Sequence, residues 1–220
     1  MKHERILGAM VGMAIGDAMG MPTELMTPQR ISKIYGVVRS FVAPDKEHYH
    51  CGKLVRAQIT DDTEQMLALC DSYFKYSEFT AAHTAEALIQ WAHERDVFHS
   101  TYLGPSSGAA LKRLMQGEDP ASTGQYGTTV GSAMRVLPIA VVYSEDLATT
   151  AAMAVEVSLP AHGTSGAIAG ACAMAAALAA GFSEIPTMDQ VFAAAAFGAE
   201  FGSGHGWPYP AASIPKRMSW

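Results

Sequence analysis

The chain has 220 residues, of which 49% are hydrophobic and 16% charged, and its formal net charge is −6 at neutral pH. This length is enough to bury one sizeable core, so we expect a single domain over residues 1–220. The acidic balance and the absence of a long Lys/Arg run exclude a general nucleic-acid-binding protein, because phosphate neutralisation needs a basic face.

The first predicted element is a helix marked by glycines at every fourth position. These glycines, Gly8, Gly12, Gly16 and Gly20, form one stripe along the helix. Each lowers helix stability by roughly 1 kcal/mol relative to alanine. The stripe therefore predicts that another backbone approaches this helix closely.

Two apolar stretches raise the question of a leader or a membrane span. Residues 6–15 follow Lys2 and Arg5, but Glu4 lies in the basic region and Asp17 follows without a polar loop. Residues 164–182 are uncharged but rich in Ala and Gly, which favours a helix packed on all sides. The three cysteines are widely spaced and odd in number, as in reduced thiols. We expect a cytoplasmic protein without a membrane partner.

Residues 38–58 lack a clear period and are predicted to form a loop beside an acidic site. His48, His50 and Cys51 within it allow a soft-metal cluster. No second pair follows at zinc-ligand spacing, so we favour a surface loop.

The sharpest local signal is Thr60-Asp61-Asp62-Thr63-Glu64, directly before an apolar helical run. Thr60 is predicted as the N-cap, with both aspartates in the first turn. Hydroxyl and carboxylate oxygens are hard ligands of the kind that Mg²⁺ or Mn²⁺ prefers. The alternative is an ordinary cap without a metal, and the pentapeptide alone favours that alternative.

The remaining predicted elements are helical, so the fold class is expected to be an all-α bundle. A Gly/Thr/Ser-rich loop at 118–131 can expose backbone N–H groups to a phosphate or serve as a flexible connector. Helices are predicted at 63–77, 80–95, 144–157, 164–181 and 188–201. A further helix follows a turn at 102–107 and runs to residue 115, and another spans 132–143 with a break or kink at Pro138.

Five motifs in this order resemble the ADP-ribosylglycohydrolase family over nearly the whole chain. The motifs are Gly8-Ala-Met-Val-Gly-Met-Ala-Ile-Gly-Asp-Ala-Met-Gly20 with the following Glu24, Thr60–Glu64, Gly104-Pro-Ser-Ser-Gly108, Gly131-Ser-Ala-Met-Arg-Val-Leu-Pro-Ile139 and Ser158-Leu-Pro-Ala-His162. The resemblance implies an all-helical fold and hydrolysis of the bond between ADP-ribose and an acceptor, usually with two magnesium ions.

The resemblance also implies roles for individual residues. Thr60, Asp61 and Asp62 would bind Mg²⁺, with Mn²⁺ as an alternative, and Glu24 and Asp62 would be catalytic. From its position on the helix past the loop, Arg135 is expected to form a structural ion pair, with a phosphate clamp as the less favoured alternative. For His162 a buried core role is an equal alternative to a role in the site. The implied substrate-binding residues are Gly127, Gly131, Ser132, Met134 and His162.

One departure from the family pattern concerns the second half of the metal site. The family's C-terminal Asp-x-Asp-Thr segment has no counterpart after His162. We therefore expect a C-terminally incomplete bundle, which is a fragment, a truncated product or a degenerate member of the family. A C-terminal fragment that completes the fold is one candidate partner.

Three functional hypotheses follow. The first is a Mg²⁺-dependent hydrolase acting on an ADP-ribosylated protein or small molecule. The second is a non-catalytic member that binds ADP-ribose or has a structural, crystallin-like role. The third, a metal-dependent phosphoesterase, would need a His/Asp ligand pattern that the sequence lacks.

Overall fold

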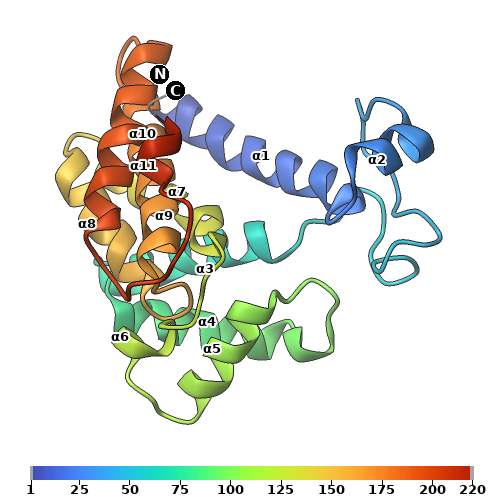
Figure 1. Cartoon of the computed structure of the whole chain (residues 1–220), viewed down its shortest axis with the longest axis horizontal. Helices are drawn as coiled ribbons and strands as arrows, with labels where there is room; N and C mark the ends of the chain where they lie inside the picture. The colour runs from blue at the N-terminus through green and yellow to red at the C-terminus, as the bar shows by residue number, and fades with distance from the viewer. Residues whose placement is uncertain (1, 219–220) are drawn as a thin grey trace.

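The computed structural model describes residues 2–218, which form an all-α bundle (Figure 1). Within this part of the chain the only β contact is one bridge between Thr164 and Trp207. The expected fold class is confirmed. In chain order the elements are α1 (Lys2–Gly20), η1 (Met21–Thr23), α2 (Pro28–Tyr35), α3 (Asp61–Tyr76), α4 (Ala81–Glu94), η2 (Val97–His99), α5 (Pro105–Met115), α6 (Pro120–Thr123), η3 (Gly131–Arg135), α7 (Leu137–Val142), α8 (Leu147–Ser158), α9 (Ser165–Gly181), α10 (Met188–Ser203) and α11 (Ile214–Met218).

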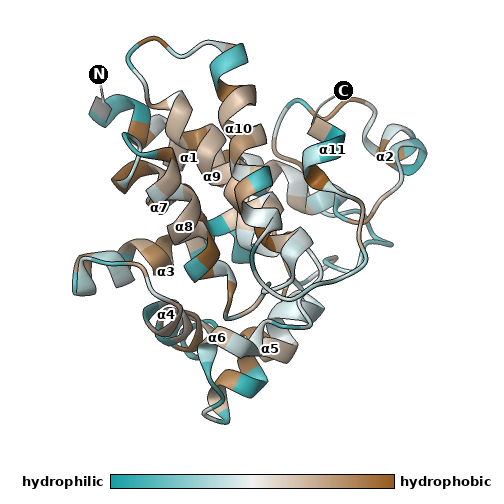
Figure 2. Ribbon diagram, turned by 60° about the vertical axis from the view of Figure 1, so that its left-hand side comes forward, coloured by the Kyte–Doolittle hydropathy of each residue, from teal (hydrophilic) through white to brown (hydrophobic). Residues whose placement is uncertain are grey.

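Helix α9 is the centre of the core and is apolar on all sides, as its composition predicts (Figure 2). It packs against α7, α8 and α10. The approach to α10 is close: a Cβ added at Gly198 would lie 2.2 Å from the Cys172 carbonyl oxygen. Small residues thus let these two helices meet backbone to backbone.

Local signals explain where several helices begin and end. Pro138 lies in the first turn of α7, so the predicted helix over 132–143 is divided into η3 and α7. Asp146 caps α8 by accepting from two backbone N–H groups, and Thr187 and Gln190 form a capping box on α10. Gly117 follows the end of α5 with a φ of +82°.

Helix α1 contradicts the packing prediction drawn from its glycine stripe. All four glycines are exposed, and a Cβ added at any of them would meet nothing within 4 Å. By length and mean hydropathy (1.3) the segment His3–Thr23 could cross a membrane, a test that core helices and leader sequences also pass. Only 17% of the tested window is buried.

A segment between α1 and α3 forms what we call the outer lobe, residues 25–58. It contains α2, which has no counterpart among the predicted helices, and the expected loop. Thr27 caps α2, Pro28 opens it, and Gly36 ends it with a φ of +65°. Figure 1 shows α2 at the far end of α1, away from α8, α9 and α10.

Candidate functional site

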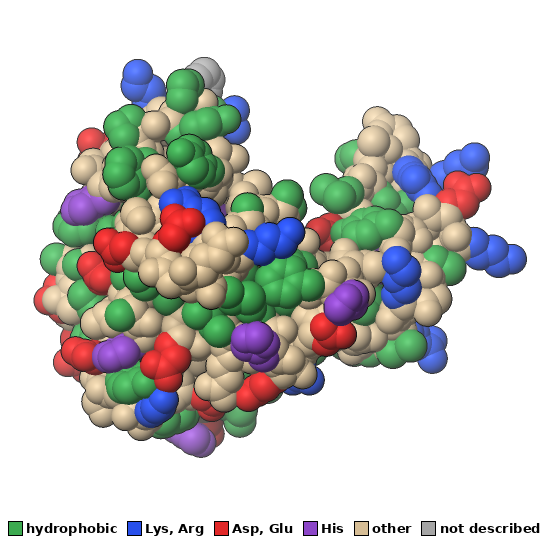
Figure 3. Space-filling view, turned by 90° about the horizontal axis from the view of Figure 1, so that it is seen from below, with side chains coloured by type: hydrophobic (Ala, Val, Ile, Leu, Met, Phe, Trp, Pro, Cys, Tyr) green, Lys and Arg blue, Asp and Glu red, His purple; other side chains and the backbone are tan. Residues whose placement is uncertain are grey.

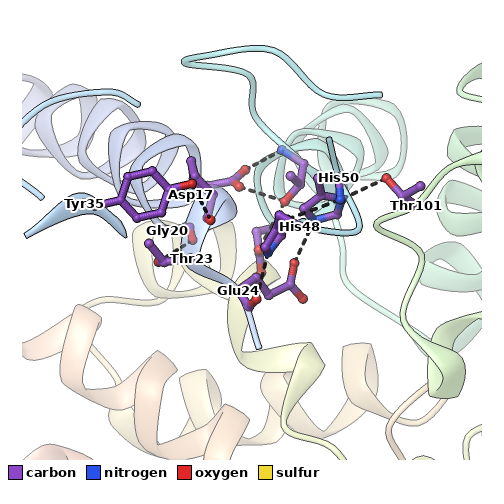
Figure 4. A network of polar contacts seen from close by, with 11 residues as sticks. Asp17, Gly20, Thr23, Glu24, Tyr35, His48, His50 and Thr101 are labelled. Atoms are coloured by element: carbon purple, nitrogen blue, oxygen red, sulfur yellow. Dashed lines mark hydrogen bonds and ion pairs between the residues drawn. The ribbon is translucent and has the colours of Figure 1, made fainter. Parts of the chain in front are cut away.

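Asp17 of α1 binds the N-terminus of α3 (Figure 4). Its Oδ1 accepts from the Thr60 hydroxyl at 2.7 Å, and its Oδ2 accepts from the Thr60 N–H at 2.8 Å and from the Thr63 hydroxyl at 2.7 Å. Thr60 stands at the predicted N-cap position, but its side chain makes no cap hydrogen bond. The capping prediction is corrected accordingly: the carboxylate that satisfies this helix start comes from another helix.

The two aspartates of the first turn of α3 share a crowded acidic environment. Burial, together with the charges of Asp62, Glu24 and Asp17, raises the pKa of Asp61 to about 8. Burial and the repulsion from Asp17 and Glu24 together raise the pKa of Asp62 to about 6. Negative charge here is therefore costly, and a bound cation would relieve that cost.

Glu24 follows η1, and a buried histidine holds its carboxylate. His50 is fully buried, its Nε2 lies 3.1 Å from Glu24 Oε2, and its Nδ1 lies 2.8 Å from the Thr101 hydroxyl (Figure 4). Burial lowers the pKa of His50, so the ring is neutral. Since the carboxylate only accepts, Nε2 carries the hydrogen and Thr101 donates to Nδ1.

Two further groups of the same loop contact Glu24. His48 Nε2 lies 2.9 Å from the Glu24 carbonyl oxygen. Burial, and then a hydrogen bond between the Tyr49 hydroxyl and the Glu24 side chain, raise the pKa of Tyr49. The expected position of the loop beside the acidic site is therefore confirmed. Its description as a mere surface loop is wrong for His48 and His50, which are buried.

A cavity of about 630 Å³ brings Glu24, Thr60 and Asp62 together. It lies between α1 on one side and η3, α7 and α9 on the other. Its remaining walls are largely apolar, and Met134 is the predicted substrate-binding residue that lines it. The other lining residues are Ala9, Met13, Gly16, Asp17, Gly20, Met21, Ala133, Leu137, Met174 and Leu178.

Two buried side chains, Arg135 and Gln65, form a line of hydrogen bonds that ends at Asp61 in the first turn of α3. Arg135 is fully buried and donates to Gln65 Oε1 at 2.7 Å and to the Val157 carbonyl at 3.0 Å. Gln65 in turn donates to Asp61 Oδ2 at 3.5 Å. The expected ion pair of Arg135 is not found among residues 2–218. A neutral amide lies instead between this cation and the carboxylate.

The glycine-rich loop packs its backbone tightly against residues 159–163. A Cβ added at Gly127 would lie 2.0 Å from the Ala161 carbonyl oxygen, and one at Gly131 would lie 2.5 Å from His162 Nε2. Ser132 and His162 are buried, and the Ser132 hydroxyl and His162 Nδ1 have no hydrogen-bond partner within the described part of the chain. Burial and nearby Arg135 lower the pKa of His162 to about 3. None of Gly127, Gly131, Ser132 and His162 lines the 630 Å³ cavity, so the structure does not bring these predicted substrate-binding residues to it.

Glu64 points away from the site although it belongs to the same pentapeptide. Its carboxylate accepts from the Trp91 indole N–H at 2.9 Å and from the Tyr102 hydroxyl at 3.3 Å. Arg95 lies 3.5 Å from it. Consecutive residues of the first turn thus spread around the helix axis, and only some of them face the site.

The donor chemistry at the α3 terminus suits a hard divalent cation. Asp61 and Asp62 are crowded carboxylates, and the Thr60 hydroxyl is beside them. Among residues 2–218, no three His, Cys, Asp or Glu side chains are grouped so that they could hold a metal by themselves. Mg²⁺ commonly uses one or two carboxylates and takes its other ligands from water and substrate. The residues present fit that kind of site.

Most of the sequence is similar to that of known proteins. The model of the ADP-ribosylglycohydrolase family matches residues 1–206. An uncharacterized protein of Archaeoglobus fulgidus is 36% identical over 177 residues, covering 80% of this chain and 55% of that protein. An ADP-ribosyl-dinitrogen reductase glycohydrolase of Rhodospirillum rubrum is 34% identical over 139 residues, covering 63% of this chain and 44% of that enzyme.

A solved structure described as an ADP-ribosylglycohydrolase-related protein complex shares the fold. The TM-score is 0.71 at 24% identity, with 90% of this chain and 63% of the other covered. The chain spans about half the length of the curated relatives that it matches. The expectation of a separate C-terminal partner fragment receives no support from these matches.

Proposed function

The chain belongs to the ADP-ribosylglycohydrolase family, and from this premise we propose that it hydrolyses the glycosidic bond between ADP-ribose and an acceptor. The observation that carries the proposal is the cavity that Glu24, Thr60 and Asp62 line together. An acidic end and an apolar wall suit a ligand that combines a polar ribose with a flat base.

The side chains of this cavity have distinct tasks in the proposed reaction. Cleavage at the ribose carbon passes through a transition state with positive charge, which nearby carboxylates stabilise. Glu24, which is half exposed and oriented by His50, accepts the proton of the attacking water. The apolar wall at Met134 and Leu137 limits access of other water.

Magnesium is part of the proposal as a cofactor. Thr60, Asp61 and Asp62 would hold it, and a bound divalent cation would supply positive charge that fixes ribose hydroxyls and acidifies water. The crowding that raises the pKa values of both aspartates supports this assignment. An acceptor on a protein is also proposed, in line with the name of the Rhodospirillum rubrum relative.

The test combines calorimetry with hydrolysis. ADP-ribose and MgCl₂ are titrated into the wild type, into Asp61→Ala/Asp62→Ala, and into Asp71→Ala as a control on an exposed position of α3. We expect only the double variant to lose Mg²⁺-dependent binding of ADP-ribose. The same variant alone should also fail to release ADP-ribose from ADP-ribosylarginine. Equal binding and equal turnover in all three proteins would contradict the assignment.

A second candidate function is binding of ADP-ribose without hydrolysis. The grouping of donors favours it, because the described residues supply two aspartates and one hydroxyl and no third acidic ligand. Tight, Mg²⁺-dependent binding of ADP-ribose with no turnover of ADP-ribosylarginine would identify this function and exclude the hydrolase.

A further inference from the structure

The outer lobe carries a charge opposite to that of the rest of the protein. Residues 25–58 contain six Lys or Arg and two acidic residues, which gives a net charge of +4. The other residues carry nine Lys or Arg against nineteen acidic residues, a net charge of −10. Figure 3 shows the Lys and Arg side chains over the right-hand lobe, with a hollow between it and the main body. The lobe's basic residues are Arg30, Lys33, Arg39, Lys46, Lys53 and Arg56.

Most of these cations are exposed and lack an internal partner. Arg30 lies 3.6 Å from Glu47. The other five are exposed, and none has a carboxylate partner among residues 2–218. Unpaired, exposed cations project a positive field that a negatively charged surface would complement.

The lobe also exposes apolar side chains between its cations. Leu25 is 89% exposed, Val37 73% and Val55 67%. Apolar side chains mixed with arginine are typical of protein interfaces. A nucleic acid would meet mainly phosphate-binding groups and would be repelled by the acidic remainder of the molecule.

The lobe directly adjoins the carboxylate that we assign to the reaction. Its His48 and His50 both contact Glu24 (Figure 4). The lobe is therefore the part of the surface that adjoins a glycosidic bond bound at Glu24. We propose that the outer lobe docks an acidic surface of the ADP-ribosylated protein, an inference that rests on the proposed function.

The experiment compares carriers of opposite charge. One ADP-ribosylarginine peptide is conjugated to serum albumin, which is acidic, and to lysozyme, which is basic. The lobe variant is Arg39→Gln/Lys46→Gln, and the control Lys112→Gln/Arg217→Gln removes two exposed charges elsewhere. At low salt we expect kcat/KM on the albumin conjugate to fall about tenfold in the lobe variant and to stay unchanged in the control. Free ADP-ribosylarginine should be cleaved equally by all three proteins.

Several outcomes would overturn the proposal. One is an equal kcat/KM of both variants on the albumin conjugate, and another is a preference of the wild type for the lysozyme conjugate. The third is a lobe variant that loses binding to duplex DNA while its kcat/KM on the albumin conjugate is unchanged. If the wild type does not cleave free ADP-ribosylarginine, the proposed hydrolase fails separately. In that case calorimetry measures the affinity of the wild type and the lobe variant for the albumin conjugate. Equal affinities would reject the proposed docking.

Discussion

The carboxyl of Asp61 gives the protein a pH-dependent stability. Its folded pKa of about 8 lies above the ordinary value of 3.8, so the folded state binds the extra proton. This contribution is complete below about pH 4 and is lost as the pH rises through about 8. Without divalent cations, we expect Asp61→Asn to exceed the wild type in free energy of unfolding at pH 8 by about 1–3 kcal/mol.

Urea unfolding at pH 5 and pH 8 measures the effect, and Asp71→Asn serves as the control. The advantage of Asp61→Asn should be larger at pH 8 than at pH 5. MgCl₂ should raise the stability of the wild type but not that of the variant. A variant that is less stable than the wild type at pH 8 in EDTA would contradict this account of the site.

His50 acts on Glu24 through one hydrogen bond, which a glutamine can replace. We expect His50→Ala to lower kcat on ADP-ribosylarginine by about 10- to 100-fold because Glu24 loses its orientation, with little change in KM. His50→Gln keeps an N–H donor and should recover most of the rate. Steady-state kinetics separate the two variants. A similar loss in both, or a change confined to KM, would assign His50 to packing alone.

At the scale of elements, glycines with opposite surroundings allow a matched comparison. Gly12 lies in exposed α1 with nothing near an added Cβ, whereas one at Gly127 would collide with the Ala161 carbonyl. We expect Gly12→Ala to stabilise the protein by up to about 1 kcal/mol. Gly127→Ala should destabilise it by about 1–3 kcal/mol. Thermal unfolding checks both signs, and a destabilising Gly12→Ala would show that α1 is packed after all.

The helices could be predicted because their signals are local. Hydrophobic periodicity and Pro138 identified the main helices of the bundle and the break before α7. Helix α2 was missed although Thr27, Pro28 and Gly36 mark its ends, because its eight residues make only about two turns. The stripe on α1 misled because spacing shows which residues share a face, not whether anything covers it.

The site was only partly predictable for a related reason. Glu24, Thr60 and Asp62 come together as the motifs imply, and their functional roles stay predictions. The contacts of His50 with Glu24 and of Asp17 with Thr60 join residues 26 and 43 positions apart, and no spacing rule reports such pairs. The buried link from Arg135 through Gln65 to Asp61 was likewise invisible along the chain.

At the scale of the whole molecule, α1 has few hydrogen bonds outside its own turns. Near its first residues Arg5 donates to the carbonyl oxygens of Ser183 and Glu184, and near its last turn Asp17 bonds to α3. The Asp17 carboxylate provides its strongest bonds to α3. We expect Asp17→Asn to lower the free energy of unfolding by about 1–2 kcal/mol, because two hydroxyls and a helix start lose a charged acceptor. Asp189→Asn, in the first turn of α10 where Thr187 supplies the cap, should change it little. Denaturant titration measures the free energy of unfolding of both variants. An equal decrease in the two would contradict the role assigned to Asp17.

The attachment of α1 through Asp17 has a consequence for the dynamics of the chain. A sparsely covered helix opens often, and each opening that separates Asp17 from Thr60 also frees the neighbouring aspartates. A ligand that needs those aspartates in place therefore slows solvent exchange of the α1 amides, although it touches only the end of that helix. Deuterium uptake along residues 3–16 therefore shows whether a ligand is bound at the aspartates next to Thr60.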